Sequence, residues 1–268
     1  MTKSCFKKLA LGLLLITFFI PASSYARLDI LPRKVIIEPR ERSGEVTILN
    51  VFDKPGLYRL KAIHYRQDEE GKYQKLEEPL SPDFDPAKHI RISPRQFEIK
   101  PKGRQKIRIS ARRPKDLPDG EYRFHLAAMR YDTASQEDDE ELSGNVAVQI
   151  SMNLGISIPV IIRHGDVHVS AKIENASYIP PEQATASKTY GEVNVNLTRK
   201  GNKSATGRLS IMHNGEEIGT SANLNIFTEV ETRNALVPMT KDPRGLGKLQ
   251  IIYTSDDGEI YDESSAQF

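Results

Sequence analysis

Cysteine and tryptophan are nearly absent from this sequence. Its 268 residues include one cysteine, Cys5, and no tryptophan. A single cysteine forms no disulfide within the chain, so the burial of apolar side chains must hold its domains together. The antibody type of immunoglobulin domain packs a tryptophan against a disulfide, and this composition excludes it.

Long apolar runs are missing after the N-terminus, since no later segment approaches the ~18 apolar residues that a membrane-spanning helix needs. The N-terminus has lysines at positions 3, 7 and 8, an apolar run over 9–20 and the small-residue end Ser24-Tyr25-Ala26. This order is typical of a secretory signal peptide. A membrane anchor is the alternative, but the short run and the A-x-A-like end favour cleavage before Arg27. We expect residues 1–26 to be removed and the mature chain to be exported.

A strong excess of charge of either sign is also missing. The formal net charge is +2, and loss of the three signal lysines leaves −1. Net charge therefore gives no argument for nucleic acid or a membrane surface as a partner.

One basic series stands out within this balance. It alternates with Ile107 and Ile109, as expected for the solvated face of a strand, and a polyanion-binding surface is the alternative. The series comprises Lys100, Lys102, Arg104, Lys106, Arg108, Arg112, Arg113 and Lys115.

Signatures of catalysis and metal binding are missing too. The sequence has no Gly-rich phosphate loop, no G-x-S-x-G motif and no acid pair in a recognisable catalytic setting. His164 and His168 are four apart in a probable strand, which places them ~13 Å from each other, too far to share a metal. We predict that the protein is not an enzyme and uses no cofactor or metal, with a hydrolase as a distant alternative.

Short apolar alternations separated by turn residues fill the rest of the sequence, and this pattern predicts an all-β protein. Seven candidate strands in the first half fit an immunoglobulin-like sandwich. They cover 28–38, 45–50, 57–65, 90–92 with 96–99, 106–111, 121–131 and 144–163.

The alternation stops around Arg163-His164-Gly165-Asp166, and a second set of strands follows. Hairpin signals at His213-Asn214-Gly215-Glu216 and Asp256-Asp257-Gly258 indicate that this half is also antiparallel β. We predict an N-terminal domain over 27–163 and a C-terminal β-sandwich over 164–268, with a loop at 177–190. The strands of the second half are expected at 167–173, 192–197, 207–212, 223–227, 233–237 and 247–253.

One predicted strand is unusually long. A strand of 15 residues spans ~50 Å at ~3.3 Å per residue, whereas most strands have ~5 or 6 residues. It either bends and keeps all its apolar side chains in its own core, or exposes part of itself as an edge. Residues 144–158 contain no charge and no proline, the features that usually protect an edge, which favours pairing with another chain. Every second residue is apolar: Val146, Val148, Ile150, Met152, Leu154, Ile156, Ile158 and Val160.

Several segments together resemble the periplasmic chaperones of pilus (fimbrial) assembly. The resemblance covers the mature chain, is strongest over 33–163 and rests on the order and spacing of the segments. They are Arg33-Lys34-Val35-Ile36-Ile37, the run from Arg42 to Asn50, Ile92-Ser93-Pro94-Arg95-Gln96-Phe97, the run from Leu117 to Arg123, and Ile156-Ser157-Ile158-Pro159-Val160-Ile161-Ile162-Arg163.

The resemblance implies two immunoglobulin-like domains joined at an angle, in a periplasmic protein that protects pilus subunits from aggregation and delivers them to an outer-membrane usher. Its long strand would complete the open sandwich of a subunit, the process known as donor-strand complementation. It implies no membrane insertion. The side chains that would enter the subunit are Val148, Ile150, Met152, Leu154 and Ile156.

The resemblance also implies a pair of cations that bind the terminal carboxylate of the subunit. The first aligns best with Lys34. The second falls on Pro159, which offers neither charge nor an N–H group. Either another cation such as Arg163 completes the pair with Lys34, or this protein sets the register of the subunit differently.

An exported immunoglobulin-like adhesin or structural pilus component is the alternative function. Such a subunit should carry a free N-terminal donor segment after the signal peptide. Here residues 28–37 are expected to form an integral first strand, which favours the chaperone.

Overall fold

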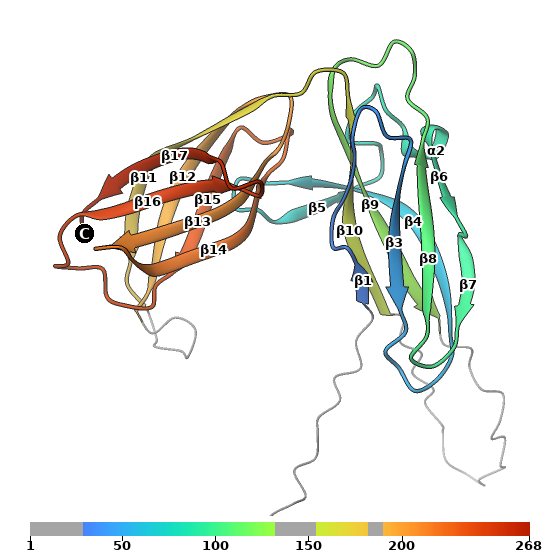
Figure 1. Cartoon of the computed structure of the whole chain (residues 1–268), viewed down its shortest axis with the longest axis horizontal. Coiled ribbons are helices and arrows are strands. Elements are labelled where there is room, and N and C mark those ends of the chain that lie inside the picture. Colours follow the sequence, from blue (N-terminus) through green and yellow to red (C-terminus); the bar gives the residue numbers. More distant parts are fainter. Residues whose placement is uncertain (1–28, 132–153, 182–189) are drawn as a thin grey trace, which may run out of the picture.

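The computed structural model describes residues 29–131, 154–181 and 190–268 as two β-sandwiches joined at an angle (Figure 1). The predicted all-β, two-sandwich fold is confirmed. The predicted signal peptide lies outside the described residues.

The N-terminal sandwich consists of two sheets. One contains, in order, β1 (Asp29–Leu31), β3 (Ser43–Leu49), β8 (Arg104–Ala111) and β6 (Ile90–Ser93). The other contains β2 (Val35–Ile37), β10 (Leu154–His164), β9 (Gly120–Tyr131), β4 (Gly56–Gln67) and β5 (Tyr73–Leu76), with β7 (Gln96–Ile99) also pairing with β4. A single helical turn, α2 (Pro86–His89), precedes β6.

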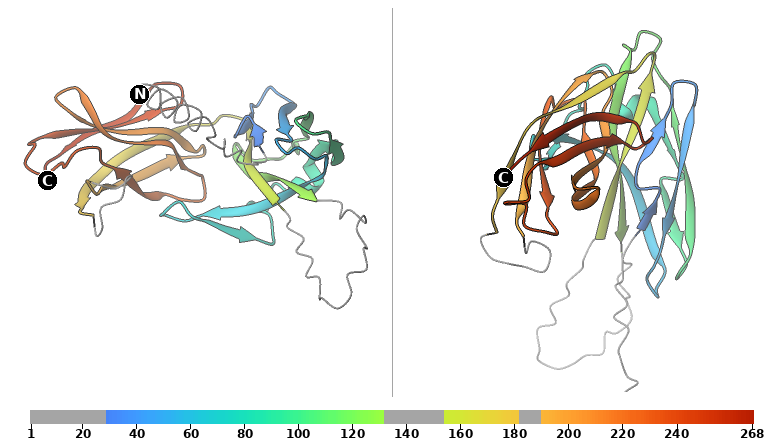
Figure 2. Two further views of the ribbon diagram at one scale, coloured as in Figure 1. Left: turned by 90° about the horizontal axis from the view of Figure 1, so that it is seen from below. Right: turned by 60° about the vertical axis from the view of Figure 1, so that its left-hand side comes forward.

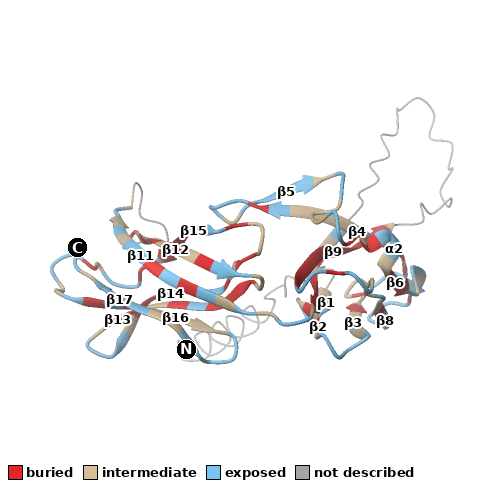
Figure 3. Ribbon diagram, turned by 90° about the horizontal axis from the view of Figure 1, so that it is seen from above, coloured by how far each residue is buried: buried red, intermediate tan, exposed pale blue. Residues whose placement is uncertain are grey.

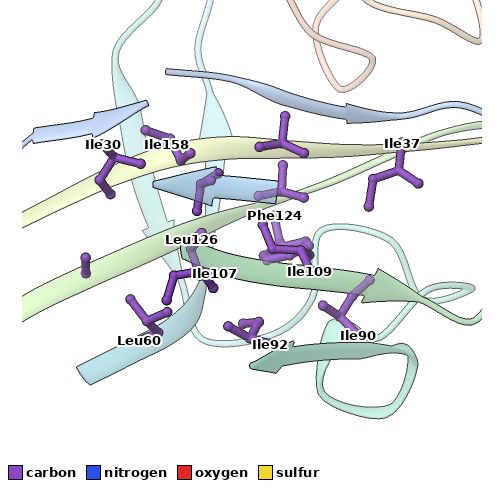
Figure 4. Close-up of a cluster of buried hydrophobic side chains, with 14 of the residues drawn as sticks. Ile30, Ile37, Leu60, Ile90, Ile92, Ile107, Ile109, Phe124, Leu126 and Ile158 are labelled. Atoms are coloured by element: carbon purple, nitrogen blue, oxygen red, sulfur yellow. The ribbon is translucent and has the colours of Figure 1, made fainter. Parts of the chain in front are cut away.

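Apolar side chains at alternate positions of the strands fill the space between these sheets (Figure 4). On β8, Ile107 and Ile109 are fully buried while Lys106 and Arg108 between and beside them are exposed, as the sequence predicts for a solvated strand face. On β9 nearly every residue is buried, because one face packs in the core and the other faces the second domain.

The predicted first strand, 28–38, is wrong in one respect. It consists of two short strands in different sheets, since β1 pairs antiparallel with β3 whereas β2 pairs parallel with β10. Pro32 lies between them, and a proline cannot donate a ladder hydrogen bond. The chain therefore changes sheets at residues 32–34.

The C-terminal sandwich has a three-stranded and a four-stranded sheet around its own core. The first contains β11 (Val169–Ile179), β12 (Glu192–Gly201) and β15 (Thr232–Pro238). The second contains β14 (Glu216–Ile226), β13 (Ala205–His213), β16 (Leu249–Ser255) and β17 (Ile260–Ala266). The predicted hairpin at 213–216 is confirmed, with Asn214 and Gly215 both at positive φ (49° and 82°).

Several further elements differ from the sequence prediction. The predicted strand 223–227 belongs to β14, which begins at Glu216, and the segments 90–92 and 96–99, predicted as one strand, are β6 and β7 in different sheets. Residues 177–179, predicted as loop, are the end of β11, and β5, β17 and α2 were not predicted. No residue of β5 or β17 is buried, so these strands lack the buried alternation that marks a strand. Asp85 caps α2 through a 2.8 Å hydrogen bond from the Ala87 amide, but one turn is too short for a helical period.

The β4–β5 hairpin joins the two domains, and Figures 1 and 3 show it reaching toward β15. At its tip, the Glu69 carbonyl accepts hydrogen bonds from the Asn234 amide (2.8 Å) and the Arg233 guanidinium (2.9 Å). The Glu69 carboxylate accepts one from the Thr232 hydroxyl (2.7 Å). The hairpin thus fixes β15 relative to the N-terminal domain, as the rotated views of Figure 2 also indicate.

A buried charged contact lies beneath this hairpin. Arg123 of β9 forms an ion pair with Glu229 of the C-terminal domain, and the two side chains are 2% and 8% exposed. The Arg123 guanidinium also lies 4.0 Å above the Phe227 ring. Removing one partner of such a pair leaves a buried charge without compensation, which typically costs ~3–5 kcal/mol, so this contact holds the domains in one orientation.

His125, two residues along the same face of β9, is buried beside Arg123. The Arg123 guanidinium lies 3.2 Å from its Nδ1, and the rings of Tyr65 and Tyr73 pack edge-on against it. Burial, together with the charge of Arg123, lowers the pKa of His125 from 6.5 to about 3. His125 is therefore neutral at pH 7, and its Nδ1 accepts the hydrogen bond.

His125 should make the protein less stable in mild acid. Because its folded pKa is lowered, the unfolded chain binds a proton near pH 6.5 that the folded protein does not. Below pH 6.5 the free energy of unfolding should fall by up to about 1.4 kcal/mol per pH unit through this group. We expect His125→Asn, which keeps an acceptor but does not titrate, to remove this part of the slope in urea unfolding between pH 7.5 and 5 (~2.5 pH units). Equal slopes in the wild type and the variant would contradict the prediction.

Candidate functional site

One edge of β10 is open over half its length. β9 pairs with it along the whole strand, from Leu154 opposite Arg130 to His164 opposite Gly120. On the other side β2 pairs only with 160–162, and no strand in the described part of the chain covers 154–159. These six residues form what we call the open edge, and an open edge is a template for an added strand.

The change of sheet at Pro32 creates the open edge. The parallel register of Val35 with Val160 would place 29–34 beside 154–159 if β2 continued backwards. Those residues instead leave for the other sheet, where β1 pairs with β3. The segment that would have covered the open edge is thus used elsewhere.

The apolar side chains at every second position of β10, which we call its apolar row, point into the N-terminal core. Ile158, Val160 and Ile162 are buried there, Ile156 is half-buried against the same cluster, and Gly155 and Ser157 are exposed. For 158–162 the structure favours the simpler interpretation, a strand that fills its own core. Of the predicted donor residues, Ile156 lies on the open edge, Leu154 is the first residue of β10, and Val148, Ile150 and Met152 lie outside the described residues.

Lys34 lies where the open edge ends. Lys34 directly precedes the Val35–Val160 pair, and Pro159 is the neighbour of Val160 on β10. The Lys34 ammonium forms a 2.6 Å ion pair with Asp256, in the turn between β16 and β17 of the other domain. The two side chains are 28% and 45% exposed, so the pair is accessible to solvent.

Asp256 also accepts a 2.9 Å hydrogen bond from the Thr206 hydroxyl. Partial burial raises the pKa of Asp256, but the hydrogen bonds from Lys34 and Thr206 and the charge of Lys34 outweigh this effect and hold it below its ordinary value. Asp256 is ionised at neutral pH, so Lys34 already binds a carboxylate of its own chain.

Arg163 is in a different environment. Its side chain is 10% exposed and donates to Glu38 (2.6 Å) and Glu121 (3.2 Å). The other oxygen of Glu121 accepts from the hydroxyl and amide of Ser204 in the C-terminal domain. A third carboxylate could reach Arg163 only by displacing Glu38, so of the two predicted anchor residues Lys34 is the more accessible.

Sequence reasoning missed the acidic partners in this cleft. Asp256 follows Lys34 by 222 residues, and Glu121 and Glu38 precede Arg163 by 42 and 125. The sequence predicts the turn at 256–258, but no neighbouring residue in the sequence indicates that this turn reaches Lys34.

The described residues contain no cluster of three His, Cys, Asp or Glu side chains that could hold a metal ion. In the described part of the chain, no helix is both long and apolar enough to cross a membrane.

No protein-family model and no curated protein matches the chain. Solved structures of pilus assembly chaperones do match its fold. The chaperone DraB of E. coli is 13% identical with a TM-score of 0.48, over 90% of this chain and 96% of that one. The chaperone–tip adhesion subunit complex CsuC–CsuE of Acinetobacter baumannii matches with 16% identity and a TM-score of 0.46, over 90% and 97%. The complex of the SafA pilin with the SafB chaperone of Salmonella enterica matches with 11% identity and a TM-score of 0.45, over 92% and 99%.

Proposed function

We propose that this protein is a periplasmic chaperone that binds pilus subunits by lending them its long strand, and that it hands them to an outer-membrane usher. The observation that carries the proposal is the open edge at 154–159, beside a strand whose apolar row continues toward Val148 in the sequence. A subunit strand added there would extend the sheet of β2, β10 and β9.

Apolar burial should supply most of the affinity. Each large apolar side chain that enters a subunit core contributes ~1.5–3 kcal/mol, against ~0–1 kcal/mol for a surface ion pair. The proposed donor side chains are those of Val148, Ile150, Met152, Leu154 and Ile156. Because Ile156 is half-buried against the chain's own core, it would lie at the junction of the two cores.

Lys34 is proposed to bind the terminal carboxylate of the subunit. Its ammonium is solvent-accessible, adjoins the open edge at Pro159 and already holds the Asp256 carboxylate. The subunit carboxylate would take the place of Asp256. Arg163 would contribute only if Glu38, which is 46% exposed, moved away.

The adhesin alternative is less well supported. It requires a free N-terminal donor segment, whereas the described N-terminal residues are paired in β1 and β2.

In the proposed chaperone function, release of the subunit would need no nucleotide. The next subunit could insert its own extension into the groove of the subunit that the chaperone strand had filled.

Charges placed in the donor row should abolish subunit capture. Ile150→Asp plus Leu154→Asp puts two carboxylates where the subunit core requires apolar groups, and burying an unpaired charge costs several kcal/mol. We expect co-expressed subunits to aggregate or be degraded, as measured by their soluble yield and co-purification.

The matched control is Ser151→Asp plus Asn153→Asp, which adds the same charge to the intervening row. This control should retain most of the capture. If the Ile150/Leu154 variant keeps its fold by circular dichroism and still protects subunits as well as wild type, the strand-lending proposal is wrong.

Two substitutions at the cleft separate carboxylate binding from domain positioning. Lys34→Ala should weaken subunit binding by about 10-fold, the loss of one charge-assisted hydrogen bond of ~1.5 kcal/mol. Asp256→Asn removes the competing carboxylate but keeps the ammonium, so it should preserve or strengthen binding. Titration of a subunit peptide with a free C-terminus measures both; equal weakening by both variants would show that the pair only positions the domains.

A further inference from the structure

A groove of about 850 Å³ lies at the end of the N-terminal sandwich where β6 begins and β8 ends. Six of its lining side chains are positively charged and exposed, and we call this site the arginine groove. In the part of the chain that the structure describes, no acidic side chain lines it. The six are Arg40, Arg42, Lys88, Arg91, Arg108 and Arg112.

These cations have few partners among the described residues. Lys88 lies 3.4 Å from the Asp85 carboxylate, and Arg108 donates to the Ser43 hydroxyl at 3.0 Å. The other four guanidinium groups make no side-chain ion pair or hydrogen bond there. An anion bound among these cations would relieve their mutual repulsion, which no acidic residue lining the described groove offsets.

The backbone that carries the cations is held in place. The Ala111 amide donates to the Arg42 carbonyl (2.9 Å), and the Arg112 amide donates to the His89 carbonyl (2.8 Å). These bonds connect the end of β8 to the segments on both sides of it. The cations are therefore brought together by the fold before any ligand binds.

Arg113 supports the groove without being free to bind. Its guanidinium donates to the carbonyls of Ile37 (3.0 Å), Glu38 (2.7 Å), Glu41 (2.6 Å) and Arg163 (2.9 Å). Glu38 and Glu41 are the acids nearest to it, and neither lines the groove. Arg113 fixes the 37–42 segment that presents Arg40 and Arg42.

The composition points to phosphate as the ligand chemistry. Five of the six exposed cations are arginines, whose planar guanidinium donates two parallel hydrogen bonds to one phosphate, and the Ser110 hydroxyl lies among them. On the neighbouring strands β8 and β6, Arg108 pairs with Ser93 and Arg91 with Ser110, so the two cations are diagonal neighbours. One phosphate of charge about −1.5 to −2 cannot neutralise six cations, so the ligand must carry several.

The size and lining of the groove favour a compact ligand. Its volume lies in the range of small-molecule sites, ~300–1,000 Å³. The large exposed apolar side chains of the described residues, such as Leu31, Leu236 and Ile260, all lie elsewhere, so the groove offers nothing to insert into a bilayer.

We propose that the arginine groove binds an anion bearing several phosphate groups, either a free oligophosphate or a phosphorylated lipid headgroup. This site lies outside the open edge and the Lys34 cleft, and it stands independently of the proposed chaperone function.

Tripolyphosphate is the first probe, titrated calorimetrically into the full-length mature protein. The wild type should bind it, and the affinity should fall as salt is raised. Arg91→Glu plus Arg112→Glu, two exposed residues without side-chain partners in the described structure, should weaken binding by about 10-fold or more. The control Lys100→Glu plus Arg104→Glu makes the same charge change on exposed residues outside the groove and should bind as wild type.

Two further probes separate the sources of phosphate. Vesicles containing cardiolipin, whose headgroup carries two phosphates, would assign a lipid headgroup if they bind wild type, release it to tripolyphosphate and fail to bind the groove variant. Tripolyphosphate binding without vesicle binding would assign a soluble ligand. The proposal is overturned if neither probe binds, if the groove and control variants weaken equally, or if an octaglutamate peptide binds more tightly than tripolyphosphate.

Discussion

Backbone pairing of β10 on one side only is the constraint on which the rest of the structure depends. β9 satisfies one edge of the strand completely, while β2 satisfies three residues of the other. Since unpaired backbone groups are strong donors and acceptors, the edge at 154–159 can pair with an added strand. The open edge exists because the chain breaks at Pro32 and sends 29–31 to the opposite sheet, where they cover the edge of β3. The sheet of β3 thus gains an outer strand, while among the described strands the sheet of β10 leaves 154–159 unpaired on one side.

Two ion pairs and one hydrogen-bonded carboxylate connect the domains, and their different exposure separates their roles. Arg123 and Glu229 are almost fully buried, so their pair is costly to break and fixes the domain orientation. Glu121, 1% exposed, connects Arg163 to Ser204 in the same way. The pair of Lys34 with Asp256 is the most exposed of the three and contributes least to holding the domains. If a subunit carboxylate replaced Asp256, as proposed, the buried Arg123–Glu229 pair would still hold the domains.

The sequence predicted the fold class well because burial in a sandwich leaves a direct period-two trace, as at 106–111 and 192–197. The sequence prediction failed where backbone pairing does not coincide with an alternation of buried apolar side chains. β5 and β17 are strands held by backbone pairing with little apolar content, and Pro32 interrupts a segment whose apolar content continues on both sides. The candidate site divides in the same way. The apolar row of β10 can be recognised in the sequence alone. The partner of Lys34 is 222 residues away, and their contact depends on how two domains meet.

The positions of Lys34 and Pro159 together constrain how a partner strand would lie. Pro159 has no N–H group, so the ladder along the open edge weakens there, at the end toward Val160. If a subunit's terminal carboxylate binds Lys34, its last strand must end beside Pro159 and run in the same direction as β10. A slip of one residue along this edge would turn every side chain of the added strand to the opposite face. In that arrangement a carboxylate held at Lys34 would prevent the slip, so this one contact would determine which side chains of the subunit meet the apolar row.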